Sequence, residues 1–373
     1  MSRRLNIVAA DVRRRILLSR AGQGFRLLTS AATNFGPACV AFVASGLLSG
    51  LTGCSTAKNS PAANQPAIVW PAAPERARIR FVQAATKPVE LGAKVGKFRR
   101  VSNWITGGET GNEAFVKPFS IAVDSADGLC VTDTATRSVG WLDPVTKRWH
   151  QWNRLGKLRF ASPVSVAKSG EILFVSDSTL GEVVAFNTKG VLQFRLKENL
   201  VRPVGLAIHG ERLYVADSQQ HKVVVFGMNG ERISEFGKRG NGDGDLNFPT
   251  HIAVDEQGLL YVTDSMNSRV QVLDANGGFV RQIGSIGDSP GHFSRPKGVA
   301  VDHLGHVFVV DAMFDCLQIF NSDGRMLLSL GQAGQGAGEF WLPNGVAVSR
   351  DNRIYVADSY NRRVQVFEYL DEP

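Results

Sequence analysis

Aspartates recur at regular spacing along this chain. A carboxylate in such a position can bind a metal, act as a general base or accept hydrogen bonds from backbone amides. Each one ends a run of β-branched and aromatic residues; the six are Asp133, Asp177, Asp217, Asp264, Asp311 and Asp358. A cation follows five residues later in three cases, at Lys222, Arg269 and Arg363. Because the same residue returns in every copy, we expect a structural role, in which the carboxylates hold the amides of the following turn.

A second set of candidate residues follows six prolines that recur at intervals of 40 to 47 residues. The residues directly after these prolines are Phe119, Val164, Val204, Thr250, Lys297 and Asn344. The next residues are Ser120, Ser165, Gly205, His251, Gly298 and Gly345. A metal site needs several converging histidines or carboxylates, whereas these rows contain one histidine and no carboxylate. We therefore predict no metal site, no cofactor and no catalytic residue here.

Common catalytic and nucleotide-binding motifs are missing from the sequence, which contains no GxSxG, no HExxH and no P-loop. Glycine clusters such as 237–244 resemble a phosphate-binding loop at first sight. A strand-like run follows each cluster, however, where a phosphate site would need the N-terminus of a helix. We interpret these clusters as loops.

The stretch from 248 to 284 shows which elements must position these residues. Four short runs rich in β-branched and aromatic residues alternate with breaks that carry Asp, Asn and Gly. This pattern predicts a four-stranded antiparallel meander. Such a sheet on its own would expose both of its apolar faces, so it needs neighbours like itself.

Six copies of this unit are present, marked by the recurring prolines and aspartates. A four-stranded unit with a period of 40 to 47 residues predicts an all-β fold, a six-bladed β-propeller. An apolar residue stands three positions before each proline: Phe115, Phe160, Leu200, Leu246, Phe293 and Phe340. We expect these side chains to be wedged between blades.

Three of the copies read RPVGLAIHGERLYVADSQQHKVVVF, RPKGVAVDHLGHVFVVDAMFDCLQIF and LPNGVAVSRDNRIYVADSYNRRVQVF. These segments resemble NHL repeats, and the resemblance covers residues from about 117 to 368. It implies an NHL-type propeller. Propellers of that family serve as binding platforms, as sensor domains and, less often, as lyases, so the resemblance specifies the fold more closely than the function.

The last repeat has no fourth strand of its own, and an open edge in a ring of blades favours aggregation. Residues 77–83, ARIRFVQ, alternate as a strand does. We therefore predict that this segment completes the sixth blade by pairing beside 363–367. The propeller domain then spans 77–370, with an insertion at 84–116.

The N-terminal 53 residues contain seven Arg, no Lys and one Asp, followed by an apolar stretch that ends in LTGC. This arrangement predicts an export signal over 1–53. The LTGC sequence resembles a bacterial lipobox, which implies lipidation of Cys54. Residues 54–76 are rich in Ala, Pro, Ser and Asn and predict a flexible linker. These features imply a lipid-anchored protein of the bacterial cell envelope, at the periplasmic face of the outer membrane.

The predicted leader carries +6 of the formal net charge of +8, so the remaining chain is close to +2. The basic pI is therefore a property of the leader, and we expect no nucleic-acid partner. Of the four cysteines, Cys130 and Cys316 lie in predicted blades that are not adjacent. We expect both to be free, buried residues.

The insertion contains apolar residues at helical spacing with basic residues between them. The apolar set is Leu91, Val95, Phe98, Val101 and Ile105. Two interpretations remain open: a basic amphipathic helix that touches a membrane or a partner, and a cap over one face of the propeller.

The sequence thus favours a monomeric binding scaffold for an envelope protein, a peptide or a polysaccharide. Its predicted binding residues lie at the mouth of the central channel: Phe119, Val164, Val204, Thr250, His251, Lys297 and Asn344. The alternative is a metal-dependent propeller enzyme. Residues 344–359 resemble a segment of gluconolactonase-type propellers that offers Asn344 as a ligand, although the acidic partners are missing, and the multiple histidines of the related amidating lyases are missing too.

Overall fold

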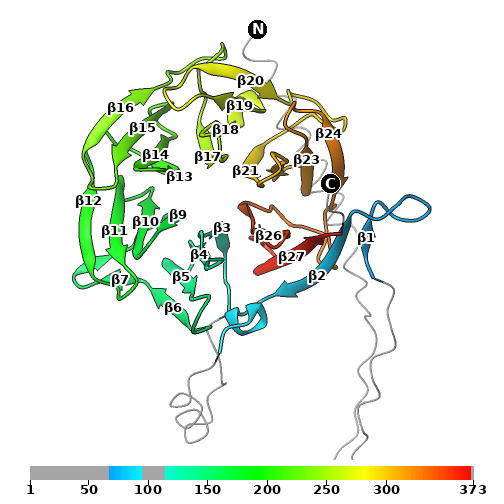
Figure 1. Cartoon of the computed structure of the whole chain (residues 1–373), viewed down its shortest axis with the longest axis horizontal. Coiled ribbons are helices and arrows are strands. Elements are labelled where there is room, and N and C mark those ends of the chain that lie inside the picture. The colour runs from blue at the N-terminus through cyan, green and yellow to red at the C-terminus, as the bar shows by residue number, and fades with distance from the viewer. Residues whose placement is uncertain (1–66, 95–113, 371–373) are drawn as a thin grey trace, which may run out of the picture. The chain divides into compact units, whose positions relative to one another are not determined.

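The computed structural model describes residues 67–94 and 114–370. These residues form six antiparallel sheets arranged around a central axis (Figure 1). Within these ranges, helix is limited to two short 3-10 turns, η1 (Pro88–Leu91) and η2 (Ser265–Asn267). The predicted all-β, six-bladed propeller is confirmed.

Five blades are meanders of four strands, numbered from the axis outward. Blade one is β3 (Pro118–Val123), β4 (Leu129–Asp133), β5 (Ser138–Leu142) and β6 (Trp149–Trp152). Blade two is β9 (Pro163–Ser169), β10 (Ile172–Asp177), β11 (Glu182–Asn187) and β12 (Leu192–Leu196). Blade three is β13 (Pro203–His209), β14 (Arg212–Asp217), β15 (Lys222–Gly227) and β16 (Arg232–Phe236).

Blade four is β17 (Pro249–Val254), β18 (Leu260–Asp264), β19 (Arg269–Leu273) and β20 (Phe279–Ile283). Blade five is β21 (Pro296–Val301), β22 (Val307–Asp311), β23 (Cys316–Phe320) and β24 (Met326–Leu330). A small hairpin, β7 (Arg154–Leu155) and β8 (Leu158–Arg159), stands in the connection from blade one to blade two.

Blade six is built from both ends of the repeat region. Its inner strands are β25 (Val346–Val348), β26 (Arg353–Asp358) and β27 (Arg363–Tyr369). The next strand is β2 (Ile79–Ala85), which pairs antiparallel with β27 and joins Ile79 to Tyr369 and Ala85 to Val364. The predicted closure by an N-terminal strand is therefore confirmed. The strand continues two residues beyond the expected end at 83.

A fifth strand, β1 (Val69–Trp70), extends blade six at its outer edge. The ring of Trp70 packs edge-on against Phe367, with the centroids 5.7 Å apart. It also covers Gly338, where an added Cβ would lie 2.4 Å from the indole. The sequence assigned these residues to the linker 54–76. In the structure, blade six begins before residue 77, because Trp70 packs against the apolar surface of Phe367 and Gly338.

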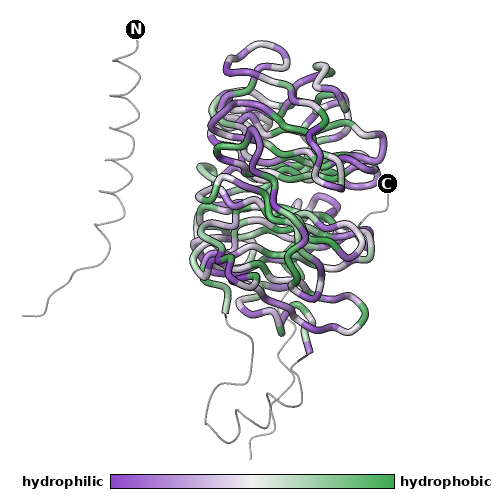
Figure 2. The backbone as a smooth tube through the Cα atoms, turned by 90° about the vertical axis from the view of Figure 1, so that its left-hand side faces the viewer, coloured by the Kyte–Doolittle hydropathy of each residue, from purple (hydrophilic) through white to green (hydrophobic). Residues whose placement is uncertain are grey.

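Six hydrophobic clusters fill the six seams between neighbouring blades. Each contains one of the apolar residues that precede the prolines, and all six of these side chains are buried. Phe160, for example, packs between Val139 of blade one and Val175 of blade two. Viewed edge-on, the hydrophobic stretches run through the blades while hydrophilic residues gather at the turns (Figure 2). The expected wedges are confirmed, and no single central core is needed.

A β-bulge follows the proline of the inner strand in blades one to five. In blade four, Pro249 pairs with Asp264 and the register then shifts before Ile252. The same shift occurs after Pro118, Pro203 and Pro296, and at Val164 in blade two. Bulges turn side chains out of the ladder and are common beside functional sites. Here they affect the two residues after each proline, which are the candidate binding residues.

Several predictions fall outside the described residues. These are the export signal at 1–53, the lipidated Cys54 and insertion residues 95–113 with Val95, Phe98, Val101 and Ile105. Leu91 ends η1, and Gly92 closes that turn with a φ of 95°. No helix among the residues that can be described is both long and apolar enough to cross a bilayer.

Candidate functional site

The six recurring aspartates are structural, as the sequence predicted, and they use two arrangements. In blades one, two, three and five, both carboxylate oxygens accept backbone N–H groups. Asp217 accepts from Val201 and Arg202 before the inner strand, and from Gln219 and Gln220 in the turn that follows. A carboxylate with this many amide donors is fully occupied by the fold.

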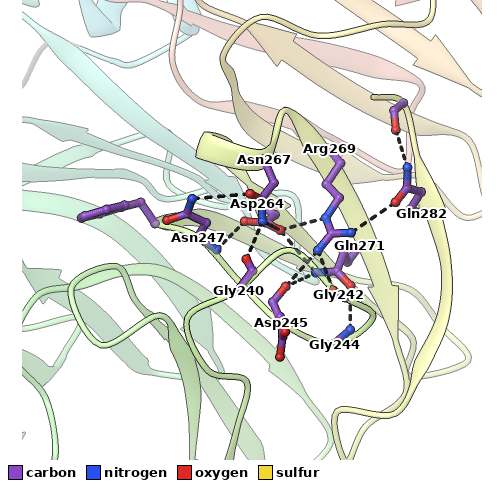
Figure 3. Close-up of polar contacts among 12 residues, drawn as sticks. Gly240, Gly242, Gly244, Asp245, Asn247, Asp264, Asn267, Arg269, Gln271 and Gln282 are labelled. Atoms are coloured by element: carbon purple, nitrogen blue, oxygen red, sulfur yellow. Dashed lines mark hydrogen bonds and ion pairs between the residues drawn. The ribbon is translucent and has the colours of Figure 1, made fainter. Parts of the chain in front are cut away.

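Blades four and six use an arginine instead (Figure 3). One oxygen of Asp264 accepts the Asn247 amide, while the other accepts from Asn267, Arg269 and Gln271. Arg269 also donates to the carbonyls of Gly242 and Asp245 in the preceding loop. Blade six repeats the cluster with Asp358, Asn361, Arg363 and Gln365. In blade three the cation at this position, Lys222, does not pair with the aspartate but with Glu235, at 2.7 Å.

The glycine-rich loops are connections between blades, as expected. The amide of Gly244 donates to the side-chain oxygen of Gln271 at 2.9 Å. Gly291 and Gly338 make the same bond to Gln318 and Gln365. These loop amides are already paired within the protein, so they do not form a free cradle for a phosphate.

All seven predicted binding residues line one cavity of about 190 Å³ at a mouth of the central channel. They come from all six blades, and those of blades one to five lie at the bulges. The cavity has four further lining residues: Ser178, Arg202, Ser218 and Phe248. These four were not predicted from the sequence. Arg202 and Phe248 directly precede a proline, and Ser178 and Ser218 directly follow a repeated aspartate, so the same repeats contained the signal.

His251 forms the floor of this cavity. It lies across the axis from blade one and stacks on Phe119, with ring centroids 6.4 Å apart and an interplanar angle of 22°. The residue is only 9% exposed, and among the described groups neither ring nitrogen has a well-formed hydrogen bond. Burial, reinforced by the positive charge of Lys297, lowers the pKa of His251 to about 3, although the nearby Lys297 backbone opposes the shift. The imidazole is therefore neutral at physiological pH.

Glycines explain why His251 can occupy this position. An added Cβ at Gly298 would lie 2.4 Å from the carbonyl oxygen of Asn344, and one at Gly205 would lie 2.7 Å from the Cα of His251. Neighbouring inner strands therefore approach too closely for side chains at these points. Only serines, glycines and one histidine stand in this row, so His251 is its one large side chain.

Lys297 and Asn344 form the polar side of the cavity. Burial, together with repulsion from Arg295 and Arg202, lowers the pKa of Lys297 to about 8. The side-chain oxygen of Asn344 is buried and has no hydrogen-bond partner among the described groups. No carboxylate lines the cavity. The opposite side consists of Phe119, Val164 and Val204.

A second cavity, of about 210 Å³, lies further along the inner strands and shares His251 with the first. Its lining is mostly valine, alanine and isoleucine. Its one cation, Lys168, forms an ion pair with Asp124 at 2.7 Å, so this charge is satisfied within the protein. Of the two cavities, only the first presents a cation that lacks an ion-pair partner among the described residues.

The ligand set of a metal enzyme does not assemble at this site. Among the residues that can be described, no three His, Cys, Asp or Glu side chains lie close enough together to hold a metal ion. Asn344, which the sequence compared with a gluconolactonase ligand, has Lys297 and not an acid as its neighbour in the lining. The lining thus combines two cations, Lys297 and Arg202, with the unpaired acceptor of Asn344 and an apolar wall.

Family models match two parts of the chain. Residues 340–367 match an NHL repeat, and residues 256–315 match a model described as a 6-bladed beta-propeller. No curated protein matches the chain.

Solved structures share the fold at low sequence identity. A protein of unknown function from Bacteroides thetaiotaomicron is 16% identical, with a TM-score of 0.57 over 78% of this chain and 75% of that one. An auxiliary nutrient binding protein from the same organism is 11% identical, with a TM-score of 0.55 over 69% and 70%.

Virginiamycin B lyase from Staphylococcus aureus is 12% identical, with a TM-score of 0.51 over 68% of this chain and 96% of that one. At these identities the likeness concerns the fold alone. Together with the two family models and the six repeats, it shows that this chain is a six-bladed β-propeller in which the last repeat matches an NHL repeat.

Proposed function

We propose that this protein is a binding scaffold whose site is the cavity at the mouth of its central channel. The observation that carries this proposal is the convergence of all seven predicted binding residues from six blades on one cavity. The Asn344 oxygen has no hydrogen-bond partner and Lys297 has no ion-pair partner among the described residues. Such buried groups destabilise the folded protein unless a ligand pairs with them.

Binding is favoured over catalysis because Lys297, with its pKa lowered to about 8, has no carboxylate in the cavity lining to work with as an acid–base pair. His251 has its pKa lowered to about 3, far below the range useful for proton transfer near neutrality. The fold itself is neutral on this question, since its structural relatives include a nutrient-binding protein and a lyase.

The proposal includes a tether. The LTGC sequence that ends at Cys54 supports lipidation, which would hold the propeller at the periplasmic face of the outer membrane. An envelope protein, a peptide or a polysaccharide would then be the partner. Metabolic labelling with a fatty-acid analogue tests the anchor: the wild type should be labelled, and equal labelling of Cys54→Ala would contradict it.

The site is tested by a crosslinked pull-down from native membranes. The triple variant His251→Ala, Lys297→Ala, Asn344→Ala should lose the partners that the wild type captures. The matched control is Lys157→Ala, His303→Ala, Asn276→Ala, which removes the same residue types from exposed positions. Unchanged capture by the first variant would refute the channel mouth as the binding site.

A further inference from the structure

The cavity at the channel mouth has a chemistry that restricts its ligand, and this inference rests on the proposed function. Lys297 is partly buried and makes no ion pair among the described residues, and Arg202 stands exposed in the same lining. With no carboxylate in the lining, the positive charge is unbalanced. A ligand that pairs with it must carry an anion.

The neutral groups restrict the ligand further. The buried oxygen of Asn344 is an acceptor without a donor, so it calls for an N–H or O–H from the ligand. The opposite wall of Phe119, Val164 and Val204 offers no hydrogen bond and favours an apolar group. The ligand therefore needs an anion, a donor and an apolar group close together.

Because the cavity is closed at its floor, it can accept the terminal residue of a ligand chain but not a segment from the middle of one. The stacked rings of His251 and Phe119 lie across the channel beneath the cavity. The space of about 190 Å³ corresponds to several water molecules at about 30 Å³ each. It suits a terminal residue, whereas the hydroxyl-rich units of a polysaccharide would leave their polar groups unpaired against the valine wall.

We propose that the cavity binds the C-terminal residue of a peptide or protein partner, with its carboxylate at Lys297, its backbone N–H at Asn344 and an apolar side chain against Phe119, Val164 and Val204. Arg202 at the rim adds long-range attraction for the same carboxylate. His251 remains neutral and completes an uncharged floor.

The experiment uses the purified full chain and acetyl-Ala-Ala-X tripeptides, where X is Leu, Ile, Val or Phe, each as the free acid and as the C-terminal amide. Isothermal titration calorimetry at pH 7 should show binding of at least one free acid. The corresponding amide should bind at least about tenfold more weakly, as expected for loss of a charge-assisted hydrogen bond. Lys297→Met should abolish this difference. Binding of the acid should weaken as the pH rises above 8, where Lys297 loses its proton.

A depsipeptide, in which an ester replaces the last amide, tests Asn344. It should bind the wild type less tightly than the peptide does, while Asn344→Leu should bind the two equally. N-acetyl-leucine tests whether the residues before the terminal one contribute to binding. If it binds as tightly as the tripeptide, the terminal residue alone makes the contacts. Thermal unfolding of Lys297→Met serves as the folding control, and the melting temperature should stay the same or rise because a buried unpaired charge is removed.

Three results would overturn the inference: equal affinity for acids and amides, binding of a uronate oligosaccharide in place of the peptides with the same dependence on Lys297, or no binding by any tripeptide at millimolar concentration. If the pull-down still depends on the mouth residues in any of these cases, the scaffold function survives and only the identity of the ligand fails.

Discussion

Blades four and six hold their turns by a different chemistry from the other four blades. In the four, both oxygens of the repeated aspartate accept backbone amides, with one long side-chain contact from Gln220 to Asp217; in the two, Arg269 or Arg363 takes one of the oxygens. In these two blades the aspartate accepts only one of the two preceding amides: Asp264 keeps the Asn247 amide, and the Phe248 amide turns to His221. In blade six, the Leu342 amide turns to Asp315 in the same way. In the two blades that carry an arginine, the second amide before the inner strand is thus bonded to the preceding blade and not to the aspartate of its own blade.

Blade five shows that the glycine loop alone does not cause this difference. Its loop and Gln318 match those of blades four and six, because Gln318 bonds to the Gly291 amide and the His292 carbonyl. It has Phe314 and Cys316 in place of the asparagine and the arginine, and the amide of Arg295 remains on Asp311. In blade three Asp217 keeps both amides although the cation Lys222 stands at the arginine position. The difference therefore accompanies the asparagine and arginine together, and not a cation alone.

Removing the cation should produce the largest effect. Arg269→Met leaves Asp264, which is fully buried, without its charged partner. We expect a loss of about 3–5 kcal/mol in the free energy of unfolding, because a buried charge is left unpaired. Lys222→Met is the matched control in blade three, where the ion pair with Glu235 is partly exposed, and should cost less than about 1 kcal/mol. Denaturant titration measures both, and equal losses would remove the distinction between the two kinds of blade.

The next largest effects should come from replacing the repeated aspartate by asparagine, which compares how much each arrangement contributes to the free energy of unfolding. Asp217→Asn replaces one acceptor oxygen by a donor that faces backbone N–H groups, and should cost about 1–3 kcal/mol. Asp264→Asn should cost more, since it also leaves Arg269 buried without a counter-ion. The same denaturant titrations apply. A larger loss for Asp217→Asn would show that amide pairing contributes more than the arginine does.

Lowering the pH should destabilise the packing around blade four, where His221 and His251 lie, before it destabilises the packing around blade six. His221 and His251 both have pKa values lowered from the usual 6.5, chiefly by burial, and that of His251 falls to about 3. The unfolded chain therefore takes up these protons first, so stability is lost as the pH falls from about 6.5. His251→Gln should flatten the dependence between pH 6.5 and 5 by up to about 1.4 kcal/mol per pH unit, while His303→Gln, at an exposed position, should not.

Hydrogen exchange locates this effect within the fold. Protonation of His221 removes the acceptor of the Phe248 amide, and burial lowers the pKa of this histidine below its usual 6.5. The Leu342 amide donates to Asp315 and does not depend on a histidine. The protection factor of Phe248 should therefore fall relative to that of Leu342 as the pH is lowered below 6.5. A parallel decline of the two would contradict the assignment.

The smallest effect concerns the cysteine that stands in place of arginine. Burial raises the pKa of the Cys316 thiol to about 12, and that of the fully buried Cys130 still further. Both are free in the structure. We expect slow alkylation of native protein at pH 8, with Cys316 reacting before Cys130 because it is 7% exposed. Fast labelling of either, monitored by mass spectrometry, would show that its seam opens readily.

Repetition made much of this molecule predictable. A wedge residue or a residue after the proline in one repeat could be checked against five others, so the seams and the mouth residues followed from the pattern. Features that occur once were harder to predict. Strand β1 has two residues, and only the surface offered by Phe367 and Gly338 makes Trp70 part of the blade. The two arrangements of the aspartates depend on loop carbonyls that accept from Arg269, and a sequence does not show the direction of a carbonyl.

The pairing of β2 with β27 has a consequence for the order of events during folding. Residues 80 and 368, whose side chains form an ion pair across these strands, are 288 positions apart. Strand β2 can pair early with its sequence neighbour β1, but its other edge must wait for β27, the last strand of the propeller to leave a ribosome or a translocation channel. Contacts of such long range form late and slowly. Until then β2 has an unpaired edge, so newly made chains are exposed to intermolecular strand exchange for the whole time that the rest of the propeller takes to emerge.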